Sequence, residues 1–156
     1  MQLYDKKHQI DVDILDFSKA FNAVPHKRLL RKPRHYGIRG NVLKWIEGFL
    51  TNRTQRVLME GEFSQSIKVL SGVPQGTVLG PLIFLCFIND LPSCVKSQVR
   101  LFADDCLLYR PIKSEEDHTI LQQDLADLES WANEWGMRFN TQKCYILRIS
   151  RSKNPR

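Results

Sequence analysis

The sequence lacks the cysteine patterns that mark zinc-binding and disulfide-stabilised proteins. Its four cysteines contain no C-x-x-C pair, and no cluster of cysteine and histidine has the spacing of zinc ligands. We therefore expect Cys86, Cys94, Cys106 and Cys144 to be free thiols in a reducing compartment.

Long apolar runs are also absent. The longest apolar stretch, Val78 to Ile88, is interrupted by Gly80 and Pro81, and it is far shorter than the ~20 residues that a membrane-spanning helix needs. The N-terminal residues MQLYDKKHQIDVD contain no apolar core of a secretory signal. These absences predict an intracellular protein of the cytoplasm or nucleus that is neither secreted nor bound to a membrane.

Acidic residues are scarce in one part of the chain. Residues 27–56 carry nine Lys and Arg side chains and a single acidic one, Glu47, within a protein of formal net charge +6. Such a stretch can hold the phosphates of a nucleic acid by releasing counterions. It can equally be the solvated surface of two short helices, and the sequence alone leaves both interpretations open.

The residues that are present predict a folded α+β protein. With 42% hydrophobic residues in 156, the chain can bury the core of one compact unit, and neither an internal repeat nor a linker divides it. We expect an antiparallel sheet with helices packed on one face. The expected helices cover 26–36 (kinked or shortened by Pro33), 41–50, 79–91 and 114–135, and the expected strands cover 10–17, 53–59, 63–70, 99–103, 106–110 and 143–149. The strand over 10–17 is predicted from its alternating apolar and acidic residues and is expected to enter a site, and the strands 53–59 and 63–70 are expected to pair as a hairpin.

Two of the helices are predicted from their apolar faces. In 41–50 this face contains Val42, Trp45, Ile46 and Phe49, and in 114–135 it contains Leu121, Leu125, Leu128, Ala132 and Trp135. Ser114 followed by Asp117 resembles a capping box at the start of the second helix.

Carboxylates occur at two strand ends. Asp16 closes the apolar strand from Ile10, and Asp104-Asp105 are expected to form a two-residue hairpin tip between two apolar strands. Adjacent carboxylates repel each other unless a cation such as Mg²⁺ neutralises them. An Asp-Asp pair is also common in ordinary exposed turns, so the turn alone does not decide between the two.

A loop rich in glycine and proline precedes the most apolar helix. Ser71 to Pro81 reads SGVPQGTVLGP. Its glycines allow the backbone to approach a ligand closely, and Gln75 offers both a donor and an acceptor. The same residues also suit a plain turn and helix start.

Together these segments resemble the reverse transcriptases of non-LTR (LINE-type) retrotransposons. The segment 16–21 is similar to polymerase motif A, and the segment 71–81 is similar to motif B. The segment 102–105 is similar to motif C, and Phe139-Asn140 together with Lys143-Cys144 is similar to motif D. The resemblance extends from about Gln9 to Leu147. It implies the palm of an RNA-directed DNA polymerase that joins a nucleotide to a primer 3′-hydroxyl with two metal ions.

The resemblance also implies residue roles and partners. Asp16, Asp104 and Asp105 would hold Mg²⁺, or Mn²⁺, and Lys143 would donate a proton to departing pyrophosphate unless it is merely solvated. Phe21 would be the gate against a ribose 2′-hydroxyl, although it could equally be a core aromatic. Gln75 and Gly76 would shape the nucleotide pocket. The implied partners are an RNA template, a DNA primer, a deoxynucleoside triphosphate, and the missing fingers and thumb regions of a full-length polyprotein.

The sequence departs from the family at two positions. Asn22 stands where the family commonly has Asp, and Pro33 where it commonly has Leu or another helix former, as in a decaying copy. We expect residues 1–150 to be a partial palm domain without fingers and thumb, followed by a frayed basic tail at 151–156. Two functions remain open: a nucleotidyltransferase by descent, and a non-catalytic retrotransposon remnant that at most binds nucleic acid.

Overall fold

A computed structural model describes residues 9–150. Within this range the protein is α+β, as the sequence predicts, with helices beside a four-stranded antiparallel sheet. The chain divides into two compact units, a division that the sequence pattern does not reveal. One unit holds the described residues up to Ser18 and from Asn89 onward, and the other is Lys19–Ile88. The expected basic tail at 151–156 lies outside the described residues.

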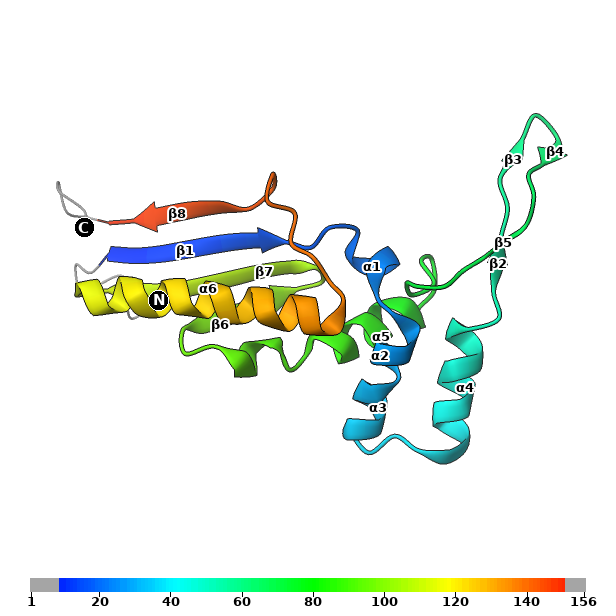
Figure 1. The fold of residues 1–156 in the computed structure, drawn as a ribbon, viewed down its shortest axis with the longest axis horizontal. Helices are drawn as coiled ribbons and strands as arrows, with labels where there is room; N and C mark the ends of the chain where they lie inside the picture. Colours follow the sequence, from blue (N-terminus) through cyan, green and yellow to red (C-terminus); the bar gives the residue numbers. More distant parts are fainter. Residues whose placement is uncertain (1–8, 151–156) are drawn as a thin grey trace. The chain divides into compact units, whose positions relative to one another are not determined.

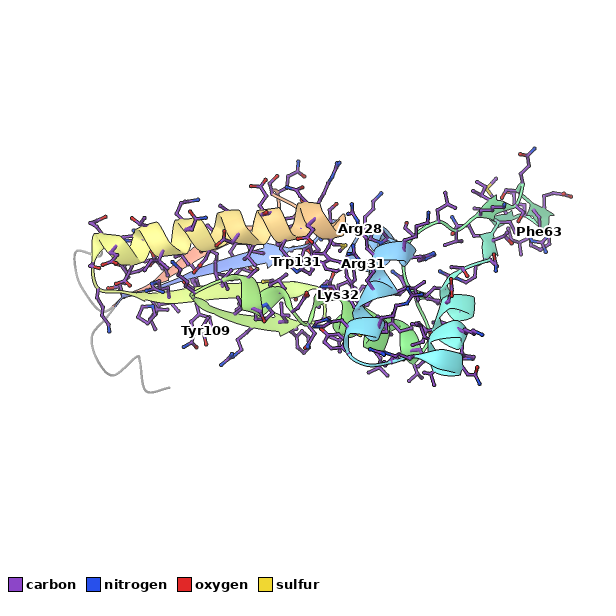
Figure 2. All side chains as sticks on the ribbon, turned by 60° about the horizontal axis from the view of Figure 1, so that its bottom comes forward. Arg28, Arg31, Lys32, Phe63, Tyr109 and Trp131 are labelled. Atoms are coloured by element: carbon purple, nitrogen blue, oxygen red, sulfur yellow. The ribbon has the colours of Figure 1, made fainter. Side chains whose placement is uncertain are left out.

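The first unit is a sheet covered by one long helix. The strands β1 (Gln9–Asp16), β6 (Gln98–Phe102), β7 (Asp105–Ile112) and β8 (Tyr145–Ile149) lie in the order β6-β7-β1-β8. Helix α6 (Glu115–Trp135) runs along one face of this sheet (Figure 1). Its stripe includes the buried Leu121, Leu128 and Ala132, as predicted, together with Trp131, which points toward the sheet in Figure 2.

Helix α6 begins where its sequence predicts. Asp117 accepts a hydrogen bond from the Ser114 backbone N–H at 3.2 Å, which satisfies a donor at the helix N-terminus. A short 3₁₀ helix, η2 (Leu91–Cys94), precedes β6, and its loop is held by Asp124 of α6. The carboxylate of Asp124 is fully buried and accepts bonds from the backbone N–H groups of Lys96 and Ser97.

Alternation along β1 places Asp11 and Asp13 on the face that α6 covers. Asp11 and Asp13 are each only 3% exposed, and His118 of α6 lies 3.8 Å from the Asp11 carboxylate. The opposite face of the sheet carries Asp16 and, on the neighbouring strand, Tyr109, which points away from α6 in Figure 2. The carboxylates of β1 therefore belong to two separate environments.

The second unit is mainly helical. Its helices are α1 (Ala20–Ala23), α2 (His26–Leu29), α3 (Arg31–His35), α4 (Gly40–Leu50) and α5 (Leu79–Ile88). The predicted helix over 26–36 is thus two short helices. Pro33 has no N–H for the Leu29 carbonyl, so an uninterrupted helix would lack that bond, and Pro33 instead lies in the first turn of α3. The predicted helix over 79–91 ends at Ile88, three residues early.

An extended arm joins α4 to the loop before α5. Strand β2 (Thr54–Gln55) pairs with β5 (Ile67–Lys68), and β3 (Leu58–Met59) pairs with β4 (Glu62–Phe63), so the expected hairpin is confirmed with two short ladders. Phe63 lies near the tip of this arm in Figure 2. The predicted apolar face of α4 is only partly buried, because Trp45 is 54% exposed while Ile46 is buried.

None of the helices within residues 9–150 combines the length and the apolar character that crossing a bilayer requires.

Candidate active site

Asp16 and Asp105 occupy directly opposite positions on neighbouring strands. They are the last paired residues at one end of the β1–β7 ladder. Side chains at opposite positions of an antiparallel pair lie on the same face, with Cβ atoms about 4.5–5.5 Å apart. The ladder therefore brings two carboxylates together although 88 positions separate Asp16 from Asp104, the neighbour of Asp105.

The hairpin turn beside this pair differs from the predicted one by a single residue. Phe102 pairs with Asp105, so the two residues at the tip are Ala103 and Asp104. Ala103 has a φ of 52°, a left-handed conformation that a residue with a Cβ rarely adopts. The prediction that Asp104 and Asp105 form the tip is therefore wrong, because Asp105 already belongs to β7. Asp104 remains in the turn beside the Asp16–Asp105 pair.

The segment before β8 carries Lys143 to the same carboxylate. The Asn140 backbone N–H donates to the Asp16 carbonyl at 2.7 Å, and the Lys143 N–H donates to the Asn140 carbonyl at 2.9 Å. Phe17 stacks on Phe139 with ring centroids 4.4 Å apart, which fixes the same turn from the side. Asn140 thus anchors this turn through the backbone of Asp16.

The ammonium group of Lys143 contacts the carboxylate of Asp16. The distance from Nζ to Oδ2 is 3.0 Å, with Lys143 68% and Asp16 16% exposed. This hydrogen bond and the charge of Asp16 raise the pKa of Lys143, and the charges of Asp104 and Asp105 raise it further. Lys143 therefore lies in the combined field of the three predicted carboxylates.

The donor chemistry of this cluster suits a hard cation, although the cluster is not a complete cage. Within the described part of the chain, no three His, Cys, Asp or Glu side chains converge on a point that could hold a metal ion. Mg²⁺ usually takes only one or two carboxylates from a protein and completes its shell with water and substrate phosphates. The Lys143 ammonium occupies Oδ2 of Asp16, while Asp105 is exposed to solvent. The residues present thus fit a metal that the protein would share with a nucleotide.

The predicted nucleotide-binding residues all belong to the second unit. The ring of Phe21, in α1, packs on Phe84 of α5 with centroids 4.4 Å apart. The Gln75 amide donates to the Asn22 side chain at 3.3 Å. Gly76 has a φ of +73°, which suits a residue without a Cβ. Gln75 thus reaches the residue that follows Phe21.

Basic side chains line two grooves in this unit. A groove of about 780 Å³ runs past Gln75 and includes Lys19, Arg53 and Lys68, and no acidic residue lines it. A second groove, of about 830 Å³, is likewise without acidic residues; its basic lining consists of His26, Lys27, Arg28, Arg53 and Lys68.

The basic stretch 27–56 is only partly available to a ligand. Lys32 is only 3% exposed, and its ammonium lies over the Phe87 ring at 5.8 Å. In Figure 2 it lies in α3 with Arg31, while Arg28 belongs to α2. Sequence reasoning missed Lys68, because it counted charge along the chain and the second strand of the arm returns Lys68 beside Arg53.

A family model and similar known proteins indicate the same family for this chain. Residues 4–154 match the family described as Reverse transcriptase (RNA-dependent DNA polymerase). The chain is 30% identical to a probable RNA-directed DNA polymerase from transposon BS of Drosophila melanogaster, over 95% of this chain and 18% of that protein. It is 32% identical to the RNA-directed DNA polymerase from the mobile element jockey of the same species, over 83% of this chain and 15% of that protein.

Solved structures show the same fold at low sequence identity. Telomerase from Candida albicans, in complex with a fragment of telomeric RNA, superimposes with a TM-score of 0.69 at 13% identity, over 93% of this chain and 27% of that one. Apo telomerase from Candida tropicalis, truncated from its C-terminal domain, gives a TM-score of 0.66 at 13% identity, over 97% of this chain and 33% of that one.

The chain spans less than a fifth of the length of the BS and jockey polymerases. The family match nevertheless covers almost the whole sequence, and the structural likeness covers the palm-type fold. The chain therefore belongs to the reverse transcriptase family of RNA-directed DNA polymerases, with relatives among those of non-LTR retrotransposons.

Proposed function

We propose that this chain is the catalytic palm portion of an RNA-directed DNA polymerase, which adds a deoxynucleotide to a DNA primer on an RNA template. The observation that carries the proposal is the pairing of Asp16 with Asp105 at the end of one ladder, with Asp104 in the adjoining turn. Three carboxylates at one end of a sheet repel one another; the Lys143 ammonium offsets this repulsion at Asp16, and a bound divalent cation would offset it further.

In this proposal Asp16, Asp104 and Asp105 hold Mg²⁺ together with the triphosphate of the incoming nucleotide. A metal pair there would stabilise the attacking and leaving oxygens of the in-line displacement. The protein supplies few ligands, so we expect weak binding of Mg²⁺ or Mn²⁺ alone and tighter binding when a nucleotide is present.

Lys143 is proposed as the proton donor to departing pyrophosphate. A lysine ammonium is protonated at neutral pH, and the turn anchored by Asn140 holds this one beside Asp16. Protonation of the leaving group in the transition state is worth typically 10²–10⁴-fold in rate. Lys143→Arg keeps the charge and Lys143→Met removes it, so the pair separates charge from proton donation.

Nucleotide selection is proposed for the second unit. The Phe21 ring has the bulk to exclude a ribose 2′-hydroxyl, and Gln75 and Gly76 would contact the nucleotide from the loop 71–76. The groove lined by Lys19, Arg53 and Lys68 offers positive charge to the template or primer phosphates.

Primer extension on an RNA template, with and without Mg²⁺, tests the proposal. The chain should be assayed alone and fused to the flanking regions of the jockey polymerase, because alignment of the reactants is worth roughly 7–11 kcal/mol when it is supplied in full. We expect Mg²⁺-dependent extension by the fusion and far less by the chain alone. A fusion that binds primed RNA but never extends it, with the three carboxylates intact, would instead support a non-catalytic remnant.

A further inference from the structure

The carbonyl oxygen of Gly72, in the second unit, accepts hydrogen bonds from two side chains. The His26 ring donates to it from Nε2 at 2.8 Å, and the Arg53 guanidinium donates from Nη2 at 3.2 Å. A carbonyl only accepts hydrogen bonds, so Nε2 of His26 must carry the proton. Two side chains that are 27 positions apart in the sequence therefore bind one backbone atom of the loop before α5.

Neither of these side chains is a solvated surface group. His26 is 7% exposed, in α2. Arg53 is half-buried and also donates from Nε to the Leu50 carbonyl, at 3.0 Å, at the end of α4. Arg53 thus connects the last turn of α4 to the loop, and His26 connects the loop to α2.

The same loop lies against the backbone of the Phe21 segment. The Gly72 N–H donates to the Val24 carbonyl and the Val73 N–H to the Phe21 carbonyl, each at 2.8 Å. A Cβ at Gly72 would lie 2.8 Å from both the Asn22 Cα and the Phe21 carbonyl oxygen, closer than any real Cβ contact. The two backbones are therefore in direct contact, and only glycine fits between them.

This contact decides where Gln75 lies relative to Phe21. Three residues after Gly72, the Gln75 amide reaches the Asn22 side chain, while Ser71 donates through its hydroxyl to the Asn22 carbonyl at 2.8 Å. A shift of the loop at Gly72 would move Gln75 away from the residue that follows Phe21.

We propose that His26 and Arg53 are positioning residues which, by sharing the Gly72 carbonyl, hold the loop 71–76 against Phe21 and Asn22 and so set the nucleotide-selecting geometry between Phe21 and Gln75. The nucleotide part rests on the proposed function. The positioning part rests only on the contacts within Lys19–Ile88.

Hydrogen exchange of single backbone amides tests the positioning part. In His26→Leu and in Arg53→Gln, we expect the amides of Gly72 and Val73 to exchange about 10-fold faster, since each variant removes one hydrogen bond to the loop. The amides of β1 and β7 serve as the reference in the same sample. His26→Gln restores a side-chain N–H donor and should restore slow exchange.

Arg56→Gln is the matched control for Arg53→Gln. It removes the same charge from the same arm, but Arg56 lies over the Phe63 ring, 3.7 Å from its centroid, and should leave exchange at Gly72 and Val73 unchanged. Unchanged exchange in Arg53→Gln, or equally fast exchange throughout residues 19–88, would overturn the positioning role. If His26→Leu does not fold, the exchange measured in Arg53→Gln alone tests the positioning role.

Nucleotide binding tests the selective part. Titration of the protein with Mg²⁺–dCTP and with Mg²⁺–CTP, followed at the Gln75 side-chain amide, should show preference for the deoxynucleotide, and Arg53→Gln should reduce that preference several-fold. Preserved preference in a variant with fast exchange at Val73 would refute the selective role. If the fusion with the flanking regions binds neither nucleotide, the proposed function fails, while the exchange measurement still decides whether His26 and Arg53 position the loop.

Discussion

Asp16 and Asp105 are paired residues of two antiparallel strands, and Lys143 contacts the first of them at 3.0 Å. The strand pairing, rather than proximity in sequence, creates this cluster. Each residue depends on a different backbone feature: Asp16 on β1, Asp105 on the start of β7, and Lys143 on the turn anchored by Asn140. Changes at the carboxylates and changes in their supports should therefore have different consequences.

Replacing a carboxylate should abolish metal-dependent chemistry. Asp16→Asn and Asp105→Asn each remove a charged ligand, and we expect nucleotide addition by the flank-restored protein to fall by at least about 100-fold, since metal-assisted stabilisation supplies several kcal/mol. Glu129→Gln, which removes an exposed charge from α6, is the matched control.

Metal binding gives a second measurement for the same variants. Mn²⁺ added with a nucleotide should broaden the NMR signals of Asp16 and Asp105 in the unmodified chain and leave Asp105→Asn largely unaffected. Tight metal binding that persists in both Asn variants, or in Asp104→Asn, would contradict the proposed ligands.

Replacement by alanine should lower the free energy of unfolding at Gly72 and raise it at Gly48. At Gly72 a Cβ would collide with the Asn22 backbone, and φ is +84°, so Gly72→Ala should destabilise the second unit by about 2–4 kcal/mol, in the range of severe backbone strain. At Gly48, inside α4, nothing lies within 4 Å of the added Cβ. Gly48→Ala should therefore stabilise the helix by about 1 kcal/mol. Urea unfolding of both variants measures the difference, and equal effects would refute this account of the loop.

Binding of nucleic acid should depend steeply on salt and little on sequence. Lys68 lines both basic grooves, so Lys68→Gln should reduce the slope of log K against log salt by roughly 1, the loss of one phosphate contact. Lys96→Gln removes the same charge from an exposed site in the other unit and should leave the slope unchanged. Fluorescence anisotropy with two RNA duplexes of unrelated sequence measures both slopes. Identical slopes in all variants would show that the two grooves do not bind the nucleic-acid phosphates.

The sequence predicted most of the first unit. The alternation of apolar residues predicted strand β1, and the apolar face that contains Leu121, Leu128 and Ala132 predicted helix α6. Both predictions succeed because each pattern depends only on residues close together in the sequence. The tip of the β6–β7 hairpin was misplaced by one residue, since the positive φ of Ala103 cannot be inferred from an alanine. The capping interaction of Asp117 was foreseen from the spacing alone.

The sequence predicted less about contacts between distant segments. Lys32 was counted among the basic residues available to phosphates, yet it is buried over Phe87, because burial depends on how α3 packs on α5. The Gly72 contacts with His26 and Arg53 have no local signature at all. Similarly, the acidic residues of β1 were expected along a strand that enters a site, but alternation places Asp11 and Asp13 under α6, away from the face that carries Asp16.

Asp13 should make the stability of the first unit depend on pH. Asp13 is 3% exposed, and its Oδ2 atom is buried without a hydrogen-bond partner. Burial, with a smaller contribution from the charge of Asp11, raises the pKa of Asp13 from 3.8 to about 6. The folded protein therefore holds this proton more tightly than the unfolded chain, so the contribution of Asp13 to stability is fully present below about pH 4 and is lost as pH rises through about 6.

The size of this effect follows from the shift. A shift of about two pKa units corresponds to about 3 kcal/mol, which the unmodified chain should lose relative to Asp13→Asn between pH 4 and pH 7. Urea unfolding in a Trp45→Phe background, followed by the fluorescence of Trp131 and Trp135, confines the measurement to α6 and its sheet. Parallel pH profiles for the two proteins would show that the Asp13 carboxyl group is solvated or paired in solution, whereas a difference confined to pH 4–6 would show that β1 carries an uncompensated carboxylate under α6.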